Sequence, residues 1–328
     1  MADRSKVQRV TSADVAAAAG VSRATVSYVL NGVHDRISEQ TRARVYDAAE
    51  RLGYVPNAVA SALRAGRTEI VLLALPPWPL GPAVAEWVTA GVNELERLGY
   101  TPLVHFGHGG DSRSFSRACD RVRPVALVAP GEDLPPARVA TLRENGTRGL
   151  LAIAPEPLEH VATVVVNQGR VGRLATEHLL ERGHETIVAV VPLEDEFAEI
   201  GAARVAGAQE VPGVRVLPVH AECSAGDIAR ALEPALRLEP TALYAFNDDY
   251  ALAAMEALAA RGLRVPEDVA VIGTDDSAPA RRMRLTTLSL GDPNQWGEFV
   301  ERLQAMIDGE DDLAPIINPP TLVQGITT

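Results

Sequence analysis

Residues 11–31 read Thr11-Ser-Ala-Asp-Val-Ala-Ala-Ala-Ala-Gly20-Val-Ser-Arg-Ala-Thr-Val-Ser-Tyr-Val-Leu-Asn31, and this stretch decides the fold of the N-terminal region. Thr11 or Ser12 can cap a first helix, and Asp14 lies in its first turn, where negative charge is stabilising. Gly20 ends that helix, because glycine accepts the left-handed conformation of a sharp stop. Ser22 can then cap a second helix. Two short helices joined by a turn that contains glycine predict a helix-turn-helix.

Helical spacing separates apolar from polar positions in these two helices and in a third. The third helix is expected from Glu39 to about Leu52, with Ser38 as its cap. The expected core positions are Val15, Ala16, Ala19, Val21, Val26, Val29, Leu30, Val45, Ala48, Ala49 and Leu52. The outward face of the second helix carries Ser22, Arg23, Thr25, Ser27 and Tyr28. These hydrogen-bonding groups suit base edges and phosphates, whereas a three-helix bundle without affinity for DNA would explain only the apolar positions.

Charge is divided unevenly along the chain. The 328 residues carry a net charge of -12, but residues 1–67 sum to +4 and the remainder to -16. A basic N-terminal module on an acidic body suggests contact with a polyanion. The length suits two or three compact units, and an apolar content of 47% is sufficient for packed cores.

The sequence predicts a soluble, cytoplasmic protein. The run from Val15 to Ala19 faintly imitates a signal peptide, but it is short, rich in alanine and preceded by Asp14. No stretch approaches the roughly 20 apolar residues that span a bilayer. Cys119 and Cys223 lie far apart without metal-like spacing, so we expect two partly buried thiols in a reducing compartment and no disulfide.

Six short motifs follow one another between Val10 and Gly66. They are Val-Thr-x-x-Asp-Val-Ala, Ala-Gly-Val-Ser-x-x-Thr-Val-Ser, Asn-Gly, Ser-x-x-Thr-Arg-x-x-Val, Leu-Gly-Tyr-x-Pro-Asn and Ala-x-x-Leu. This ordered series resembles the lactose/galactose-repressor (LacI/GalR) family of transcription regulators. The resemblance implies a helix-turn-helix domain over residues 1–56 and a hinge helix with linker over residues 57–67.

The resemblance also implies which side chains contact DNA. Arg23 and Ala24 occupy the base-reading positions, where arginine can contact a guanine and alanine a thymine methyl group. Tyr28 departs from the family, because many relatives have a base-reading arginine there. Family positions that contact phosphates or support docking hold Thr11, Ser22, Thr25, Ser27 and Asn31.

The hinge carries the remaining expected DNA contacts. Leu63 occupies the position of a leucine that family members insert into the minor groove, and Asn57 and Ala60 share its contacting face. The alternative is that Leu63 is a linker residue that packs on the body. Paired hinge helices and two half-sites match the two-fold symmetry of an operator, so we expect a homodimer.

From Thr68 onward, buried strands alternate with amphipathic helices. The expected strands are Ile70–Leu75, Thr101–Phe106, Val125–Ala129, Leu150–Ile153, Thr163–Val166, Thr186–Val191, Val214–Val219, Ala242–Phe246 and Val269–Gly273. The expected helices are Val84–Leu98, Arg113–Arg121, Pro136–Glu144, Val171–Glu181, Ala225–Leu236 and Tyr250–Arg261. This alternation predicts parallel sheets with helices on both faces, and two such units in series predict two lobes around a cleft.

The family resemblance continues through the body. It is carried by Gly169 to His184, Phe246 to Leu252, Gly262 to Asp276, and Leu285-Thr-Thr-Leu. It implies an α/β body, residues 68–328, that is similar to periplasmic sugar-binding proteins. By that resemblance the chain crosses between lobes near Val166, Leu290 and Ile317. The N-lobe then holds about 68–166 and 291–316, and the C-lobe about 167–290 and 317–328.

Three residues occupy positions that bind effectors in the family. They are Arg204 in Arg-x-x-Gly, Asn247 after the expected strand, and Asp275 in Gly-x-Asp-Asp. A guanidinium, an amide and a carboxylate offer donors and acceptors to a polyhydroxyl ligand. Each has a structural alternative: Arg204 as a surface helix residue, Asn247 as a helix cap, and Asp275 as the tie of a turn. Departures from the family around residues 76–82 and 192–211 point to an unusual ligand or to none.

The combined prediction is a transcription regulator, expected to be a repressor, that binds a palindromic double-stranded DNA operator as a homodimer. A small effector, such as a sugar, would control its affinity for DNA. A transport-type solute receptor would match the body but would leave residues 10–66 unexplained. An enzyme is disfavoured, because the sequence has no Gly-x-Ser-x-Gly, no phosphate loop and no metal-spaced histidine cluster. We expect no cofactor, no metal and no membrane partner.

Overall fold

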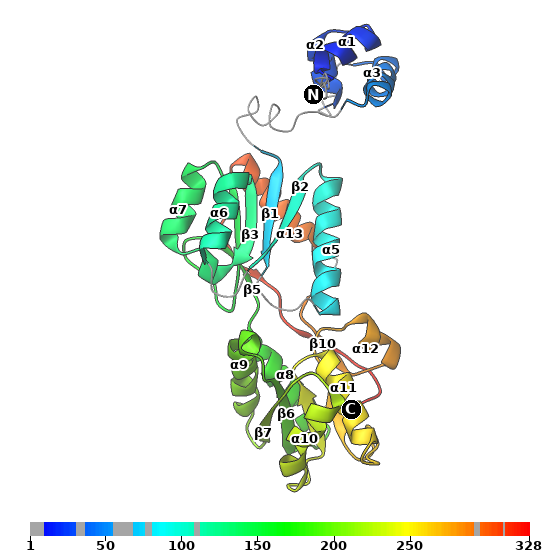
Figure 1. The fold of residues 1–328 in the computed structure, drawn as a ribbon. Coiled ribbons are helices and arrows are strands. Elements are labelled where there is room, and N and C mark those ends of the chain that lie inside the picture. The colour runs from blue at the N-terminus through cyan, green and yellow to red at the C-terminus, as the bar shows by residue number, and fades with distance from the viewer. Residues whose placement is uncertain are drawn as a thin grey trace, which may run out of the picture. The chain divides into compact units, whose positions relative to one another are not determined.

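The computed structural model describes residues 10–30, 37–54, 68–75, 81–107, 112–291, 296–310 and 312–328 (Figure 1). The chain forms two compact units, Met1–Thr68 and Glu69–Thr328. None of the helices within the described ranges is long and apolar enough to cross a membrane.

The first unit contains the three expected helices. They are α1 (Ser12–Ala19), α2 (Arg23–Leu30) and α3 (Glu39–Leu52). Asp14 Oδ2 accepts hydrogen bonds of 2.7 Å from the backbone N and the Oγ1 of Thr11, which closes the first turn of α1. Gly20 ends α1 at a φ of 64°, a left-handed conformation that favours glycine. The buried core consists of Val15, Ala16, Ala19, Val26, Val29, Val45, Ala48 and Ala49. The expected helix-turn-helix is therefore confirmed.

The N-lobe of the second unit is built on a six-stranded parallel sheet of order β11-β5-β4-β3-β1-β2. Its strands are β1 (Ile70–Leu75), β2 (Thr101–Phe106), β3 (Ala126–Pro130), β4 (Gly149–Ala154), β5 (Ala162–Val165) and β11 (Ile316–Ile317). Its helices are α5 (Pro82–Arg97), α6 (Ser112–Val122), η1 (Gly131–Asp133), α7 (Pro136–Glu144) and α13 (Trp296–Asp308). Alternate side chains of each strand face opposite sides, so α5 and α13 cover one face and α6 and α7 the other.

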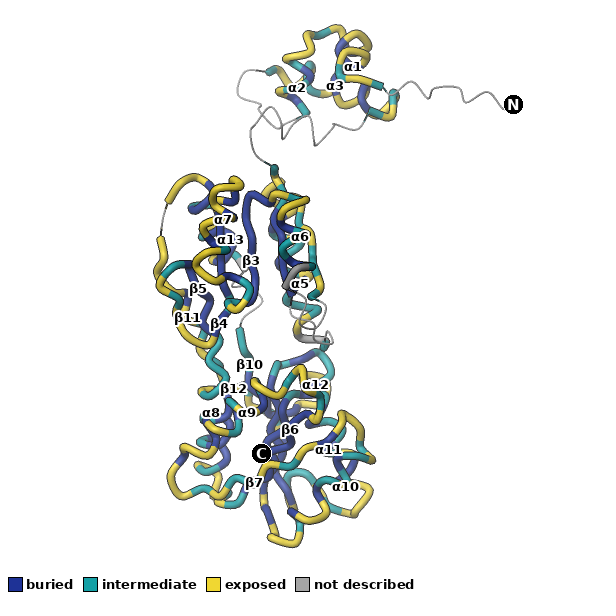
Figure 2. Tube along the Cα trace, turned by 60° about the vertical axis from the view of Figure 1, so that its left-hand side comes forward, coloured by how far each residue is buried: buried dark blue, intermediate teal, exposed yellow. Residues whose placement is uncertain are grey.

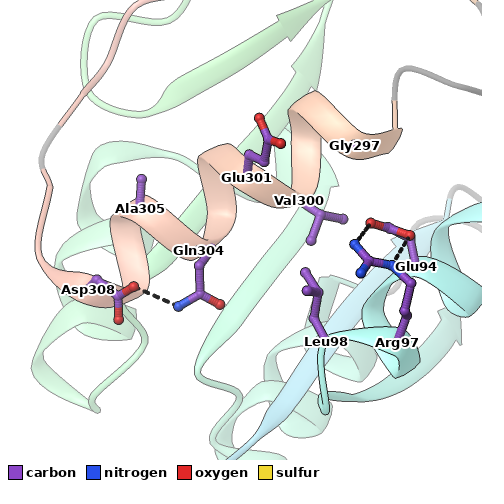
Figure 3. Close-up of a pocket in the computed structure, with 9 residues that line it drawn as sticks. All are labelled: Glu94, Arg97, Leu98, Gly297, Val300, Glu301, Gln304, Ala305 and Asp308. Atoms are coloured by element: carbon purple, nitrogen blue, oxygen red, sulfur yellow. Dashed lines mark hydrogen bonds and ion pairs between the residues drawn. The ribbon is translucent and has the colours of Figure 1, made fainter.

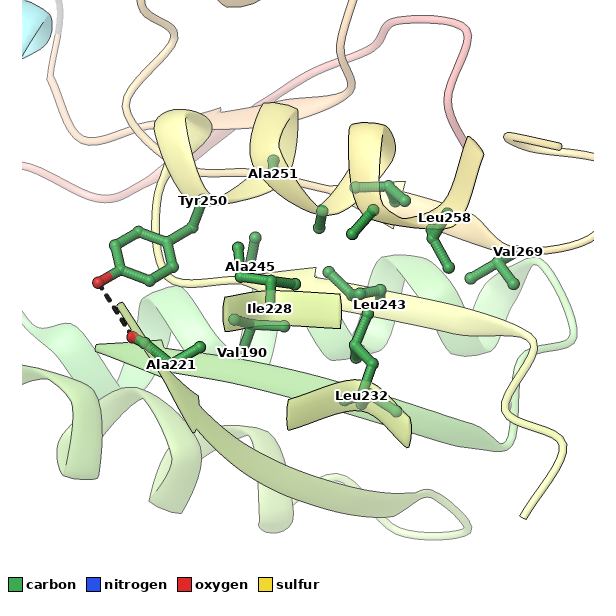
Figure 4. Close-up of a cluster of buried hydrophobic side chains, with 14 of the residues drawn as sticks. Val190, Ala221, Ile228, Leu232, Leu243, Ala245, Tyr250, Ala251, Leu258 and Val269 are labelled. Atoms are coloured by element: carbon green, nitrogen blue, oxygen red, sulfur yellow. Dashed lines mark hydrogen bonds between the residues drawn. The ribbon is translucent and has the colours of Figure 1, made fainter. Parts of the chain in front are cut away.

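The C-lobe is built on a four-stranded parallel sheet of order β7-β6-β8-β9. Its strands are β6 (Thr186–Pro192), β7 (Arg215–Ala221), β8 (Ala242–Ala245) and β9 (Ala270–Ile272), with β10 (Thr287–Ser289) and β12 (Thr321–Val323) as a separate antiparallel pair. Its helices are α8 (Gln168–Glu181), η2 (Asp195–Phe197), α9 (Ala198–Gln209), α10 (Ala225–Leu236), α11 (Asp248–Ala259) and α12 (Ala278–Met283). Figure 4 shows the core between the sheet and helices α10 and α11, in which Ile228, Leu243 and Leu258 are fully buried.

The chain passes between the lobes after β5, between β10 and α13, and between β11 and β12. In both lobes the buried residues follow the strands, and the exposed residues lie on the outer turns of the helices (Figure 2). The two lobes of strands and covering helices confirm the expected α/β body.

The body differs from the sequence-based expectations in several features, among them helices α12 and α13, which are not among the expected helices. Helix α9 lies within residues 192–211, where a helix is expected only as the alternative setting of Arg204; Gly201 and Gly207 lower the helix propensity of that segment. Both free thiols are expected to be partly buried, but Cys119 is buried and Cys223 is exposed. Cys223 follows the end of β7, where the chain turns outward to the cap of α10.

Candidate functional site

Helix α2 presents the polar face that the sequence predicts. Ser22 Oγ caps the helix by accepting a hydrogen bond of 3.0 Å from the backbone N of Thr25. The opposite face is anchored in the core, because Val26 and Val29 have no exposed surface. Arg23 and Ala24 are exposed, Thr25 and Ser27 are partly exposed, and Tyr28 is 54% exposed. The outward side chains of α2 are thus accessible while the helix itself is held from behind.

Of the other residues expected to contact DNA, one lies at the start of α1 and the rest lie outside the part of the chain that the structure describes. Thr11 is exposed and caps α1, and its hydrogen bonds to Asp14 hold the pKa of that carboxyl below its usual value. Asn31, Asn57, Ala60 and Leu63 lie outside the described residues. Tyr46 on α3, which the sequence analysis does not single out, donates a 3.2 Å hydrogen bond to the backbone oxygen of Val29 and ties down the end of α2.

The expected effector residues meet at the carboxyl ends of the C-lobe strands. In the order β7-β6-β8-β9, the chain connections reverse direction between β6 and β8, and parallel sheets bind ligands outside such a point. Phe246 and Asn247 follow β8 directly, and Asp275 follows β9. Arg204 reaches this edge from α9, because its Nη1 donates a hydrogen bond to the backbone oxygen of Phe246.

Arg204 is a buried residue, which overturns the alternative of a surface helix residue. Only 5% of its surface is exposed. Its Nε donates a 2.8 Å hydrogen bond to Oε1 of Gln168, the first residue of α8. Its guanidinium carbon lies 4.6 Å from the ring centroid of Phe246, within the range of a cation–π interaction. A buried guanidinium held on three sides is a rigid donor at the edge of the sheet.

Asp275 lies in a strained turn and has an unusual pKa. Its φ is 112° and that of Asp276 is 50°, both in a region that favours glycine. Its backbone N donates a 2.7 Å hydrogen bond to Leu288, whereas none of the described groups donates a hydrogen bond to its carboxylate. Burial raises the pKa of Asp275 to about 7, against the opposing effect of Arg204. The carboxylate is therefore available to hydroxyl or amine donors of a ligand.

Asn247 performs the capping role that the structural alternative assigns to it. Its Oδ1 accepts a 3.0 Å hydrogen bond from the backbone N of Tyr250 in the first turn of α11. This bond occupies one lone pair of the oxygen, and the side chain remains partly exposed at the end of β8. Capping and ligand contact are therefore compatible at Asn247.

Asp248 is a structurally important residue of this edge that the sequence analysis does not place in the site. It is 1% exposed, and burial raises the pKa of its carboxyl. Its Oδ2 accepts a 2.7 Å hydrogen bond from the backbone N of Ser277, and its Oδ1 accepts one of 2.5 Å from Thr287. Asp248 thereby joins α11 to both sides of the strained turn that carries Asp275. The only signal in the sequence is the doubled aspartate after a strand.

Acidic side chains surround the same edge. Tyr250 Oη donates a 3.0 Å hydrogen bond to Oε2 of Glu194, beyond β6, and lies 3.3 Å from the backbone oxygen of Ala221. Although Cys223 as a residue is exposed, partial desolvation of its thiol, with the charges of Asp249 and Glu194 as smaller causes, raises the pKa of Cys223 to about 11. A thiol with such a pKa is almost entirely protonated at neutral pH, so Cys223 is a weak nucleophile.

A separate groove lies between α5 and α13 in the N-lobe (Figure 3). It has a volume of about 350 Å³ and is lined by Glu94, Arg97, Leu98, Gly297, Val300, Glu301, Gln304, Ala305 and Asp308. Glu94 and Arg97 pair with each other in its wall, with 2.9 Å between Arg97 Nε and Glu94 Oε2. None of these lining residues follows the carboxyl end of a strand, so we do not assign the effector to this groove.

Comparison with known proteins places the two units in one family. Residues 11–57 match the model of bacterial regulatory proteins of the lacI family, and residues 176–328 match a periplasmic binding protein-like domain. The chain is 31% identical over 279 residues to the HTH-type transcriptional repressor PurR of Aliivibrio salmonicida, covering 80% of this chain and 81% of that protein. The chain belongs to the LacI family of bacterial regulatory proteins. This LacI-family protein is thus a DNA-binding transcription regulator and not an enzyme, which confirms the resemblance.

Two further relatives cover nearly the whole of this LacI-family chain. The HTH-type transcriptional regulator CelR of Thermobifida fusca is 32% identical over 311 residues, covering 88% of each chain. The crystal structure of the lac repressor dimer bound to operator and the anti-inducer ONPF is 26% identical, with a TM-score of 0.76, and covers 98% of this chain and 99% of that chain. A structure of CelR in complex with cellobiose is 27% identical, with a TM-score of 0.64.

Proposed function

We propose that this LacI-family regulator represses transcription as a homodimer bound to a palindromic operator, and that a small polyhydroxyl effector in the C-lobe controls its affinity for DNA. The observation that carries the proposal is the exposed polar face of α2, set on a helix-turn-helix of the family fold. A protein with this role works where its operator DNA lies, so we assign it to the cytoplasm, in association with the nucleoid.

The contacts with DNA follow from the exposed side chains of the first unit. Arg23 can donate two hydrogen bonds to the major-groove edge of a guanine, and Ala24 can contact a thymine methyl group. Thr11, Ser22, Thr25, Ser27 and Asn31 are assigned to phosphate contact or docking support, and Tyr28 to the groove edge. Leu63 would insert into the minor groove at the operator centre, with Asn57 and Ala60 beside it.

The dimer is supported by the logic of the operator and by a relative. Two copies of α2 can read two half-sites only if the protein has the two-fold symmetry of a palindrome. The lac repressor, to which this chain is similar over nearly its whole length, was crystallised as a dimer on its operator.

The effector site combines Asn247 and Asp275, which follow the carboxyl ends of β8 and β9, with Arg204, whose side chain reaches this edge from α9. A buried guanidinium, a partly exposed amide and a carboxylate without a described partner offer donors and acceptors to adjacent hydroxyl groups. A solved structure of CelR is a complex with cellobiose, a polyhydroxyl ligand. A ligand that binds one arrangement of the two lobes more tightly than another increases the population of that arrangement. This shift would change the affinity of the protein for DNA.

The test is selection of genomic DNA fragments by the purified protein at physiological salt, followed by sequencing. We expect enrichment of a short palindrome with a flexible pyrimidine–purine step at its centre. The selected fragment is then bound in the presence of cellobiose, other neutral sugars and purine bases, one compound at a time. Enrichment no greater than that of nonspecific DNA would contradict the assignment of α2.

A matched pair of variants separates the two halves of the proposal. Arg23→Ala should weaken enrichment of the palindrome without changing the response of the body to a ligand. Arg204→Ala should retain enrichment of the same palindrome but lose the response to the compound that affects the parent protein. Loss of both properties in each variant would indicate misfolding, which circular dichroism detects.

A further inference from the structure

Helices α8 and α9 pack against each other at glycines. A Cβ atom added at Gly172 on α8 would lie 1.8 Å from the backbone oxygen of Arg204 on α9. A Cβ added at Gly207 on α9 would lie 1.9 Å from the backbone oxygen of Gly169 on α8. Both distances are far inside van der Waals contact, and both partners are backbone atoms that cannot rotate away. The two helices can approach this closely only with glycine at both positions.

The two contacts are reciprocal. Gly169 and Gly172 are three residues apart on α8, and Arg204 and Gly207 are three residues apart on α9, so each pair lies on one face of its helix. Gly172 and Gly207 each lie against a backbone oxygen of the other helix. Glycine at both positions therefore allows the close approach of the two helices, and the glycine of the Arg-x-x-Gly motif acquires a structural role.

The side chain of Arg204 depends on this approach. Its Nε hydrogen bond of 2.8 Å ends on Gln168 of α8, and its Nη1 hydrogen bond ends on the backbone of Phe246. The helix backbone that carries Arg204 is the same backbone that contacts Gly172. Displacement of α9 by the width of a methyl group would lengthen the bond to Gln168 beyond the range of a hydrogen bond.

We propose that Gly172 and Gly207 are positioning residues of the effector site, which set the guanidinium of Arg204 between Gln168 and Phe246. This proposal rests on the proposed function for the importance of Arg204 to the effector, but its geometric content does not require a ligand. A role limited to packing would lower the stability of the C-lobe when either glycine is replaced, yet would leave the surroundings of the Arg204 side chain as they are.

The test observes Arg204 directly by ¹H–¹⁵N NMR on the full chain. The Nε–H of Arg204 is hydrogen-bonded and its guanidinium stacks on Phe246, so we expect a resonance displaced by the ring current and protected from exchange with water. Its loss in Arg204→Lys assigns it. Gly172→Ala and Gly207→Ala should shift this resonance to the exposed-arginine region or broaden it beyond detection.

Two control substitutions separate positioning from stability. Gly226→Ala on α10 adds a Cβ with nothing within 4 Å, and should leave the resonance unchanged and the melting temperature equal or slightly higher. Gly201→Ala lies on α9 itself, but its Cβ would meet a side-chain methyl of Val191 at 2.6 Å. Gly201→Ala should lower the melting temperature and leave the Arg204 resonance in place.

Gly169→Ala keeps the test decisive if the two larger overlaps prevent folding. Its Cβ would lie 3.3 Å from Asn167 Oδ1 and 3.7 Å from the backbone oxygen of Ala203, which is a mild contact in the same crossing. We expect a folded protein with a smaller shift of the Arg204 resonance. An unchanged resonance in any folded variant of Gly172, Gly207 or Gly169 would overturn the proposal.

The proposed function fails separately, on different measurements. Absence of operator binding by the parent protein would contradict the regulator's assigned mode of DNA contact without affecting the NMR result. Conversely, an Arg204 resonance that is the same in the parent and in the glycine variants would overturn the positioning role. It would leave the result of operator selection unaffected.

Discussion

Arg281 on α12 of the C-lobe and Glu86 on α5 of the N-lobe form an ion pair, with 2.9 Å between Nη2 and Oε2. The same guanidinium lies 3.4 Å from Oδ2 of Asp276, the neighbour of Asp275. Arg281 therefore connects the contact between the lobes to the turn that carries the candidate effector carboxylate. Both side chains of the pair are roughly half exposed, so its strength should depend on ionic strength.

Glu86→Gln should loosen the contact between the lobes. The expected loss in the free energy of unfolding is below about 1 kcal/mol, because exposed ion pairs are weak. The difference in melting temperature between parent and variant should be larger at 50 mM NaCl than at 500 mM. The reason is that the Debye length falls from about 14 Å to about 4 Å, so the ion pair is screened more strongly at high salt. Glu94→Gln breaks an ion pair within α5 and is the matched control. Hydrogen exchange then compares the protection of α12 in the two variants. Equal protection of α12 in both variants would argue against a link between the lobes.

In the absence of ligand, Asp275→Asn should raise the free energy of unfolding, and the size of the increase should depend on pH. Because the folded-state pKa of Asp275 is about 7 and the unfolded carboxyl has a lower pKa, folding favours the protonated form. The parent protein therefore loses stability at this site as pH rises from about 4, the unfolded pKa, to about 7, and the loss levels off above pH 7. We expect urea unfolding to show a gain of about 1–3 kcal/mol for the variant at pH 8. At pH 4 the gain should be small, and an identical gain at pH 4 and pH 8 would argue against a raised pKa.

Arg23→Ala should weaken binding to the selected operator by about 1–3 kcal/mol and relax the preference at one base pair of each half-site. The reason is the loss of a side chain that reads a base edge, rather than one that contacts only phosphates. Arg51→Ala on α3 removes the same charge from a residue that pairs with Asp47, with 3.6 Å between Nε and Oδ2, and serves as the control. Fluorescence anisotropy with operator and single-base variants measures both effects. A uniform loss on all DNA sequences would reassign Arg23 to a phosphate.

Leu63→Ala should weaken operator binding strongly while the body keeps its melting temperature. Without the leucine side chain, the hinge has no apolar group to insert between the central base pairs, unstack them and bend the duplex. The loss should be greatest on operators with a flexible pyrimidine–purine step at the centre and smaller on operators with a stiff step. Operator affinity equal to that of the parent would favour the alternative, in which Leu63 packs on the body.

The accuracy of sequence-based prediction differed between the two units. In the first unit, the caps at Thr11, Ser22 and Ser38 and the stop at Gly20 act within four residues, so local rules were sufficient to predict each helix. In the body, continuous apolar strands predicted parallel sheets, because such strands are buried on both faces. Helix α9 was considered only as the alternative setting of Arg204, since the glycines that its packing requires are the residues that weaken its helical signal.

The amino-acid sequence by itself determined the helix-turn-helix, the alternation of strands and helices, and the family to which the chain belongs. All three depend on periodicity and on motifs that are short in sequence. Only the tertiary structure decided that Arg204 is buried, that Asp248 ties the turn of Asp275, and that Arg281 joins the lobes to Glu86. These properties arise from contacts between residues 29 to 195 positions apart, which no local pattern encodes because they exist only after the two sheets have formed.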